Sequence, residues 1–385
     1  MIVRDAATDA VTKARDVLLG VSHFVHAHPE LGYEEYQSAE AVASAAEQAG
    51  FVVERGIASL PTAFRATKGS GDLHIVFCAE YDALPDVGHA CGHNIIAASS
   101  LGAAIGLAAV ADELGLTVIL LGTPSEEGGG GKIDLLNAGY FEGVHAAMMI
   151  HPWPNERLEA ACLAVDHFDV TFKGKEAHAS AAPFEGVNAL DALTVAQVAI
   201  ALLRQQMRPG DQIHGIVVEG GSAANVIPAH VVGRYMCRST TTKRLGELRV
   251  RVNACFEAGA LATGAQFTIE ELGSAFSHME SDRDILAHYR DAAEGLGRRF
   301  ALDDAGAPRP TISTDMANVS LVVPSIHPLL AIPTHGAVNH QPEFTAACLG
   351  GAADQAVLDG AIALAHTAIS VAQDQTLRAR LVHRS

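Results

Sequence analysis

The feature that most constrains the fold of this chain is a set of three short apolar runs, each followed by residue types that bind metal ions. Runs of this length and composition predict buried β-strands. In an open parallel α/β sheet, ligands bind beyond the carboxyl ends of the strands, so strands that deliver such residues to their ends describe one site. The runs are residues 73–79, 116–122 and 146–150.

Polar side chains with metal-binding chemistry follow each predicted strand. The first strand leads into residues 80–94, EYDALPDVGHACGHN, where Gly and Pro favour a loop. A lone Cys or His is more often core or solvated surface than a ligand, so this loop by itself also fits a structural role. Metal-binding residue types follow all three apolar runs, and this recurrence favours a metal site instead. The side chains are Asp82, His89, Cys91 and His93 after the first run, Glu126 and Glu127 after the second, and His151 after the third.

Length, charge and cysteine content limit the number of domains, the kinds of partner and the compartment that the chain is expected to have. A chain of 385 residues exceeds what one core usually supports, and its length favours about two domains. The net charge of −18 argues against nucleic acid and against an anionic membrane as partners. The N-terminal segment shows no apolar stretch of a secretory signal, and the six cysteines contain no CxxC pair, which fits reduced thiols in the cytoplasm.

The order of predicted elements gives an α/β fold in two domains, the second inserted into the first. Residues 1–162 alternate helices and strands and form the first part of a catalytic, metal-binding domain. They include an uncharged run at 94–111 that predicts a tightly packed core helix, although its length touches the lower bound of a membrane span. Residues 163–274 have the order β-α-β-β-α-β, the ferredoxin-like arrangement. Residues 275–385 complete the first domain, whose mixed, largely parallel sheet lies between helices.

The glycine-rich segment 128–132, GGGGK, is similar to a phosphate-binding loop but fails its spacing. That spacing requires Gly at the position of Glu126 and Ser or Thr at the position of Ile133. The glycines are better explained by a tight turn beside the metal site, ahead of a helix over about 133–138.

Seven motifs together resemble a known family over nearly the whole chain. The family is the aminoacylase and glutamate-carboxypeptidase family of two-metal metallopeptidases. The branch with a cysteine ligand is the most similar; it contains auxin-conjugate amidohydrolases, aminobenzoyl-glutamate hydrolase and a Lys/Arg-dipeptide hydrolase. The motifs are residues 80–94, SEEGGGGK at 125–132, MMIHP at 148–152, GKEAHAS at 174–180, GGSAANVIP at 220–228, STDMANVS at 313–320 and NHQPEF at 339–344.

The resemblance implies a role for each matching position. Two departures, Glu80 and Asn94 where auxin hydrolases usually have Asp, point to the dipeptidase and aminobenzoyl-glutamate sub-branch. The implied metal ligands are Cys91, His93, Glu127, His151 and His340, with Glu126 as general base, Asp82 orienting a ligand, His178 reaching the substrate carbonyl, and Asn225 and Arg238 contacting substrate.

Chemistry supports this set independently of the resemblance. A ligand set of thiolate, imidazole and carboxylate favours Zn²⁺, and its carboxylates are also compatible with Mn²⁺. Five ligands exceed the need of one catalytic zinc, so we expect two divalent ions that share a ligand. A metal-bound hydroxide would attack the amide while Glu126 moves the proton, and His178 would donate to the oxyanion. Glu126 and Glu127 also fit a solvated acidic pair, and His178 also fits an exposed loop histidine.

The expected function is hydrolysis of the amide bond of N-acyl amino acids or dipeptides by a cytoplasmic enzyme. The inserted domain is expected to act as a lid and to form a homodimer, with His178 serving its own site or its partner's. One alternative is a cysteine-nucleophile hydrolase that uses Cys91 with His93 as base. A second alternative is a non-catalytic metal-binding homologue, against which the intact Glu126 argues.

Overall fold

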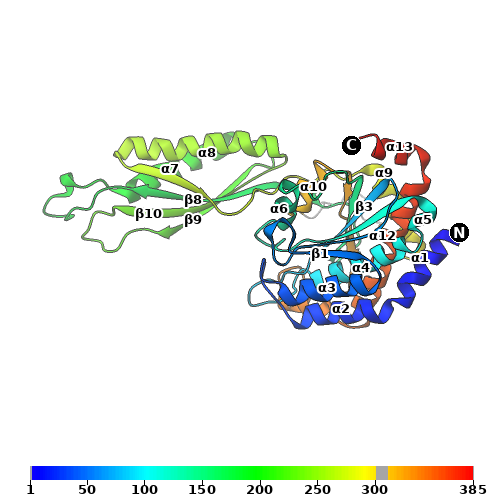
Figure 1. Cartoon of the computed structure of the whole chain (residues 1–385). Helices are drawn as coiled ribbons and strands as arrows, with labels where there is room; N and C mark the ends of the chain where they lie inside the picture. The colour runs from blue at the N-terminus through cyan, green and yellow to red at the C-terminus, as the bar shows by residue number, and fades with distance from the viewer. Residues whose placement is uncertain (1, 301–310, 385) are drawn as a thin grey trace. The chain divides into compact units, whose positions relative to one another are not determined.

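The computed structural model of the protein describes residues 2–300 and 311–384. The chain forms two compact units, one of Met1–Ala161 with Met279–Ser385 and the other of Cys162–His278. The predicted boundaries lie after residues 162 and 274, whereas those of the structure lie after residues 161 and 278. The second unit is therefore a continuous segment inserted into the sequence of the first unit (Figure 1).

The first unit holds most of the helices and the larger sheet. Its helices are α1 (Ile2–Lys13), α2 (Arg15–Ala27), α3 (Tyr36–Gln48), η1 (Ile57–Ser59), α4 (His93–Ala108), α5 (Ala111–Leu114), α6 (Gly131–Asn137), α9 (Arg283–Gly295), α10 (Met316–Ser320), α11 (Pro342–Ala347), α12 (Gly351–Gln373) and α13 (Gln375–Val382). Its strands are β1 (Val52–Arg55), β2 (Phe64–Gly69), β3 (Leu73–Ala79), β4 (Leu116–Gly122), β5 (Ala146–Met148), β6 (His151–Trp153), β13 (Ser325–Ile326) and β14 (Leu329–Ala331), and β7 (Ala161–Cys162) pairs with β12 (Thr311–Ile312) at the boundary.

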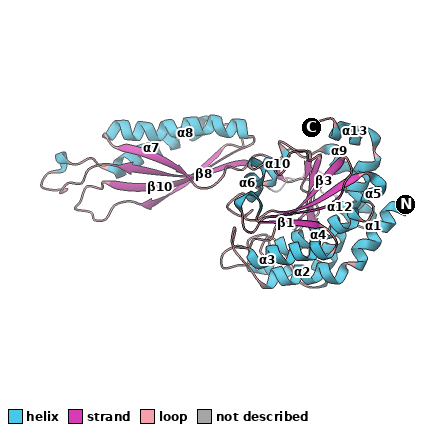
Figure 2. Ribbon diagram, viewed as in Figure 1, coloured by secondary structure: helices cyan, strands magenta, loops and turns pink. Residues whose placement is uncertain are grey.

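A six-stranded sheet in the order β1-β2-β4-β3-β5-β13 forms the centre of the first unit. Strands β4, β3, β5 and β13 are parallel, and β2 and β1 add an antiparallel edge. Side chains of β3 alternate between two cores, Ile75 and Phe77 on one face and Val76 and Cys78 on the other. Burial on both faces explains why the central strands are continuous apolar runs. The predicted α/β class is confirmed (Figure 2).

Helix α4 is the core helix that the uncharged run predicted. It is buried on nearly all sides and packs against α12, α2 and α1. A Cβ at Gly102 would lie 2.7 Å from Cβ of Ala361, and one at Gly106 would lie 2.8 Å from Val11. Small residues therefore permit the close approach of the surrounding helices. Within the described residues, α12 is long and apolar enough to cross a membrane, and 78% of its apolar window is buried inside the protein.

The third apolar run differs from its prediction. Residues 146–150 were expected to form one strand, but β5 ends at Met148 and β6 begins at His151. The reason is a change of partner: β5 pairs with β13 in the large sheet, whereas β6 pairs with β14 in a separate two-stranded sheet. His151 therefore begins a new strand where the chain leaves the main sheet.

The second unit has the predicted β-α-β-β-α-β order. Its four-stranded antiparallel sheet runs β11-β8-β10-β9, and both long helices lie on one side of it (Figure 1). Phe168, Phe172 and Tyr235 from the sheet pack around Phe256 of the second helix. The elements are β8 (Ala164–Lys173), η2 (Pro183–Glu185), α7 (Ala189–Leu203), η3 (Arg204–Gln206), β9 (Gln212–Glu219), β10 (His230–Ser239), α8 (Thr242–Thr263) and β11 (Gln266–Glu271).

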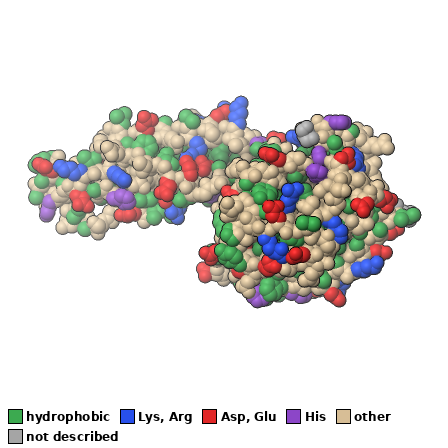
Figure 3. Space-filling model, viewed as in Figure 1, with side chains coloured by type: hydrophobic (Ala, Val, Ile, Leu, Met, Phe, Trp, Pro, Cys, Tyr) green, Lys and Arg blue, Asp and Glu red, His purple; other side chains and the backbone are tan. Residues whose placement is uncertain are grey.

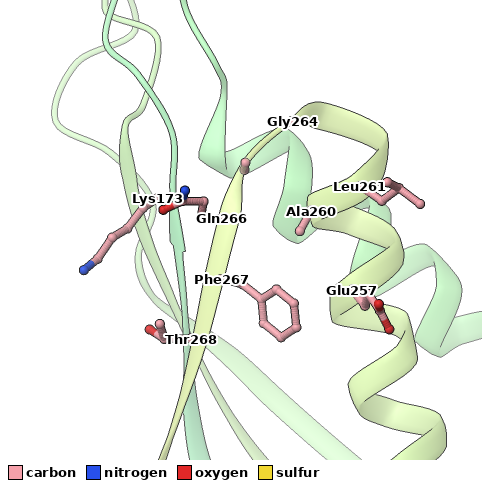
Figure 4. Close-up of a pocket in the computed structure, with 9 residues that line it drawn as sticks. Lys173, Glu257, Ala260, Leu261, Gly264, Gln266, Phe267 and Thr268 are labelled. Atoms are coloured by element: carbon pink, nitrogen blue, oxygen red, sulfur yellow. The ribbon is translucent and has the colours of Figure 1, made fainter.

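A hollow of about 650 Å³ lies beside β11 and the end of α8 in this unit. Figure 4 shows Phe267 reaching from the strand toward the helix, while Lys173 extends away from it. None of the predicted site residues lines this hollow. On the face drawn in Figure 3, acidic and basic side chains are interspersed over both units.

Candidate metal centre

The loop after β3 turns sharply at Gly92, which caps the start of α4. Gly92 has a φ of 74° in the left-handed region, and a Cβ there would lie 2.8 Å from Pro152 and 3.1 Å from the Sγ atom of Cys348. Glycine is required by both conformation and space. The turn places Cys91 just before the helix and His93 at its first position.

The five predicted ligands form two groups that share Cys91. One group is Cys91, His93 and His151, and the other is Cys91, Glu127 and His340; the ligand atoms in each lie within 4.8 Å of one another. Nε2 of His340 is 3.6 Å from a carboxylate oxygen of Glu127. Nε2 of His93 and Oε1 of Glu127 are buried without a hydrogen-bond partner among the described residues. Orphaned polar atoms of this kind fit a pair of divalent ions.

Asp82, which the resemblance implied to orient a metal ligand, lies against His93. Its Oδ1 lies 2.9 Å from Nδ1 of His93, and its Oδ2 accepts the backbone N–H of Glu127 at 2.9 Å. Nδ1 therefore carries the proton, and Nε2 keeps its lone pair for a cation. Burial acts to lower the pKa of His93, yet the charge and hydrogen bond of Asp82 raise that pKa well above its usual value. A bound cation would take the place of the extra proton.

His151 reaches the centre from the first position of β6. Its Nδ1 lies 2.9 Å from the backbone oxygen of Pro152, which leaves Nε2 free. Burial, and then the nearby His93, lower the pKa of His151 to about 3. The ring is therefore neutral, which is the form that binds metals.

The glutamate pair follows β4 through a strained turn. Ser125 has a φ of 56°, and Glu126 is buried at 7% exposure rather than solvated. Burial raises the pKa of Glu126 well above its usual value, and Glu80 and Glu127 raise it further. The interpretation as a solvated acidic pair is wrong for Glu126, because its surroundings withhold water and favour proton uptake.

Cys91 lies in surroundings that suit a ligand better than a nucleophile. Burial raises the pKa of the Cys91 thiol well above its usual value, and the charge of Glu127 raises it further. A nucleophilic cysteine needs a lowered pKa, whereas a divalent cation at the thiol would remove its proton.

His340 approaches from the C-terminal part of the chain. Its side chain is 62% exposed, its φ is 71°, and its backbone N–H donates to the carbonyl of Ala90 at 3.0 Å. This hydrogen bond ties the loop of His340 to the residue just before Cys91.

The structure brings two of the three predicted residues of the second unit together. The backbone N–H of Ala179 donates to the carbonyl of Asn225 at 3.0 Å, and His178 forms a bridge with Val226. Nδ1 of His178 accepts N–H groups of Ser180 and Ala181 at 3.3 and 3.2 Å. The neutral ring therefore holds its proton on Nε2, the form that donates a hydrogen bond.

Arg238 lies elsewhere in the second unit, on β10. Its side chain is half-buried, and its Nε donates to the sulfur of Met236 at 3.1 Å. Alternation along β10 puts Arg238 on the sheet face opposite to the buried Tyr235 and Cys237.

Sequence reasoning missed several buried polar groups beside the centre. Lys132 Nζ contacts Glu80 and Asp315, and all three residues are fully buried. The ring of His327 lies 5.4 Å from that of His151, and neither of its ring nitrogens has a hydrogen-bond partner among the described residues. Lys132 was visible only as the last residue of a failed phosphate-loop pattern and of the motif SEEGGGGK, and Asp315 only as part of the motif STDMANVS.

The grouped ligands and the two-unit fold define a metal-dependent hydrolase with an inserted ferredoxin-like domain. Residues 76–361 match Peptidase family M20/M25/M40, and the chain belongs to this family. It is 38% identical over 385 residues to the Xaa-Arg dipeptidase of Mus musculus, covering 96% of this chain and 89% of that protein. It is 33% identical over 276 residues to a component of the p-aminobenzoyl-glutamate hydrolase of Escherichia coli, covering 66% of this chain and 57% of that protein.

A solved structure shows the same fold. The Bacillus subtilis YXEP protein, described as a dinuclear metal binding peptidase from the M20 family, matches with a TM-score of 0.72 at 21% identity, covering 94% of this chain and 99% of that chain. The predicted resemblance is confirmed, and the protein is a metal-dependent amidohydrolase of the peptidase type. The alternatives of a cysteine-nucleophile hydrolase and of a non-catalytic homologue are not favoured.

Proposed function

We propose that the protein hydrolyses dipeptides whose C-terminal residue is basic, using two divalent ions, Zn²⁺ or Mn²⁺, per chain. The observation that supports the metal pair is the set of five ligand-type side chains, from segments far apart in the sequence, that form two groups around Cys91. The observation that supports the substrate is the similarity to an Xaa-Arg dipeptidase over 96% of this chain. The charge of −18 also favours approach of a cationic substrate.

Each proposed residue has a role that its geometry permits. Bound divalent ions would polarise the scissile carbonyl and lower the pKa of water. Glu126 is buried and has a raised pKa, so it can take the proton of the attacking water and return it to the leaving amine. His178 donates from Nε2 to the developing oxyanion, while Asn225 and Arg238 contact the substrate, the guanidinium being suited to its carboxylate.

A substrate panel tests this function directly. Protein stripped with a chelator and reloaded with Zn²⁺ or Mn²⁺ would be assayed on Xaa-Arg and Xaa-Lys dipeptides, on neutral and acidic dipeptides, and on N-acyl amino acids. We expect activity only after reloading, with the highest kcat/KM for the basic dipeptides. Preference for acidic dipeptides or N-acyl amino acids would overturn the substrate proposal. Activity that survives metal removal would overturn the metal proposal.

We further propose a homodimer through the second unit, in the cytoplasm. Strand β9 is an edge strand whose apolar side chains are exposed, whereas the other edge, β11, carries Gln, Thr and Glu. An exposed apolar edge is a surface that proteins normally cover. A second apolar strip runs along α7 at helical spacing. The exposed side chains are Ile216, Val217 and Val218 on β9, and Val195, Val198 and Leu202 on α7.

The oligomeric state tests the dimer with a matched pair of variants. Ile216→Lys places a charge on the exposed edge of β9 and should give monomers in sedimentation experiments. Leu261→Lys serves as the control, because Leu261 is 84% exposed on α8 outside both strips. A wild-type protein that is monomeric at all concentrations would exclude the dimer.

A further inference from the structure

The turn that carries Glu126 and Glu127 has an unusual backbone conformation at Ser125, the residue just before Glu126. The φ of Ser125 is 56°, in the left-handed region that residues with a Cβ rarely adopt. Such a conformation persists only where surrounding groups hold the backbone. The carbonyl of Ser125 accepts the N–H groups of Gly129 and Gly130 at 3.2 and 2.8 Å, so its N–H needs a partner from outside the turn.

Glu35, the N-cap residue of α3, supplies that partner. Its Oε1 accepts the N–H of Ser125 at 2.8 Å, although 90 positions separate the two residues. Both are buried, with exposed fractions of 0% for Glu35 and 3% for Ser125. Water cannot readily replace a lost partner at a buried N–H, so this hydrogen bond is costly to break. Glu35 therefore anchors the backbone immediately before Glu126.

The segment that leads to Glu35 contacts the same turn at close range. A Cβ at Gly32 would lie 2.3 Å from Oγ of Ser125, and one at Gly129 would lie 2.2 Å from the ring of Tyr33. The φ of Tyr33 is 65°, which is also in the left-handed region. Neither side of this contact has room for a Cβ, so a change in the segment is expected to move Ser125.

Glu127 has a separate anchor. Its backbone N–H donates to Oδ2 of Asp82 at 2.9 Å. Loss of the hydrogen bond between Glu35 and Ser125 leaves this second contact in place. Such a loss should therefore displace Glu126 more than Glu127, and it should affect proton transfer more than metal binding.

We propose that Glu35 is a positioning residue for the general base. By binding the N–H of Ser125, Glu35 holds the left-handed turn, and the turn directs the carboxylate of Glu126 toward the attacking water. This inference rests on the proposed function, in which Glu126 moves the proton. A displacement of about 1 Å from productive geometry can lower a rate about 10²-fold, so a single anchor of this kind can control kcat.

Two substitutions at Glu35 separate the hydrogen bond from the charge. Glu35→Gln keeps an acceptor oxygen for the N–H of Ser125, whereas Glu35→Leu has none. Activity would be measured per folded, metal-loaded chain. In Glu35→Leu we expect kcat to fall about 10²-fold with an unchanged KM and both ions retained, whereas in Glu35→Gln kcat should stay within about 3-fold of wild type.

Asp359→Leu is the control for loss of a largely buried carboxylate in the same unit. Oδ2 of Asp359 lies 2.9 Å from a guanidinium nitrogen of Arg298, and the side chain of Asp359 is 13% exposed. The control should destabilise the protein without lowering kcat. Normal kcat in folded Glu35→Leu would overturn the proposal, and so would a loss of the same size in Glu35→Gln or in the control.

A second pair of variants covers the case in which Glu35→Leu does not fold. Gly32→Ala adds a Cβ that presses on Oγ of Ser125, so kcat should fall by at least ~10-fold. Adding Ser125→Gly removes Oγ, and glycine adopts a positive φ without strain, so the double variant should regain the kcat of Ser125→Gly alone. Normal kcat in Gly32→Ala, or a loss that Ser125→Gly does not restore, would overturn the proposal. Wild-type protein that hydrolyses no amide after metal loading would instead refute the proposed function.

Discussion

Asp82 forms hydrogen bonds with two of the candidate metal ligands, and this makes Asp82→Asn an informative perturbation. The carboxylate meets two donors, Nδ1–H of His93 and the backbone N–H of Glu127, each at 2.9 Å. An asparagine side chain has one acceptor oxygen and one NH₂ group, so one of the two donors would face another donor. In either orientation of the asparagine amide, the variant therefore loses the hydrogen bond to His93 or the one to Glu127, and that ligand is no longer held in place.

The size of this effect follows from the remaining contacts. The backbone carbonyl of Asp82 also accepts from Nδ1 of His93 at 2.8 Å, so the ring is not released completely. We expect metal affinity to fall about 10–100-fold, which corresponds to ~1.4–2.8 kcal/mol. Because Asp82 is 2% exposed, solvent screening does not reduce this figure.

Isothermal titration of chelator-stripped protein with Zn²⁺ measures this change, and kcat at saturating Zn²⁺ reports whether the reloaded site is intact. Asp359→Asn is the control, since Asp359 accepts from Nε of Arg298 at 3.0 Å in the same unit and contacts no predicted ligand. Wild-type zinc affinity in Asp82→Asn would refute the assigned role of Asp82. An equal loss in Asp359→Asn would point to general destabilisation instead.

Three more outcomes are expected. Glu126→Gln should keep both ions and lower kcat by at least ~10²-fold, whereas Glu127→Gln should lose one ion; elemental analysis with steady-state kinetics distinguishes them. His178→Ala should lower kcat by about 10²-fold or more without changing metal content, and activity regained on mixing it with Glu126→Gln chains would show that His178 acts across a dimer. Burial raises the pKa of Glu35 to about 7, so the folded protein binds a proton at this carboxyl more tightly than the unfolded chain does. The free energy of unfolding therefore falls as the pH rises from about 4.5 through 7. Glu35→Gln should remove this pH dependence, about 3 kcal/mol in denaturant unfolding, and an unchanged profile would contradict the assignment.

Strands were predictable where local composition alone determines them. β3 and β4 have the predicted bounds, Leu73–Ala79 and Leu116–Gly122, because both faces of each strand are buried and the apolar run equals the strand. The end of β5 was not predictable, because it depends on pairing with β13, which lies far along the chain. Local pattern carries no information about such a partner.

Cys91, His93, Glu127 and His151 were predictable because parallel strands bring their carboxyl ends to one edge, whereas His340 was implied only by the family resemblance. The grouping of Cys91 with His93 and His151 follows from that topology. The contact between Lys132 and Asp315 did not follow, since 183 positions separate the two residues and neither lies in a periodic pattern. A buried lysine is rare enough that composition favours a surface position for it.

The insertion of the second unit has a consequence for the order of events during synthesis. Cys162–His278 is a continuous segment with its own core, so it can fold as soon as the ribosome releases it. The metal-binding unit must wait, since His340 closes the site and α12 packs against α4 directly behind the loop of Cys91 and His93. Throughout that interval the thiol and imidazole groups lack the scaffold that holds them together. Loading of the ions is therefore expected to follow release of the finished chain, and nascent chains arrested before residue 340 should expose Cys91 to alkylation.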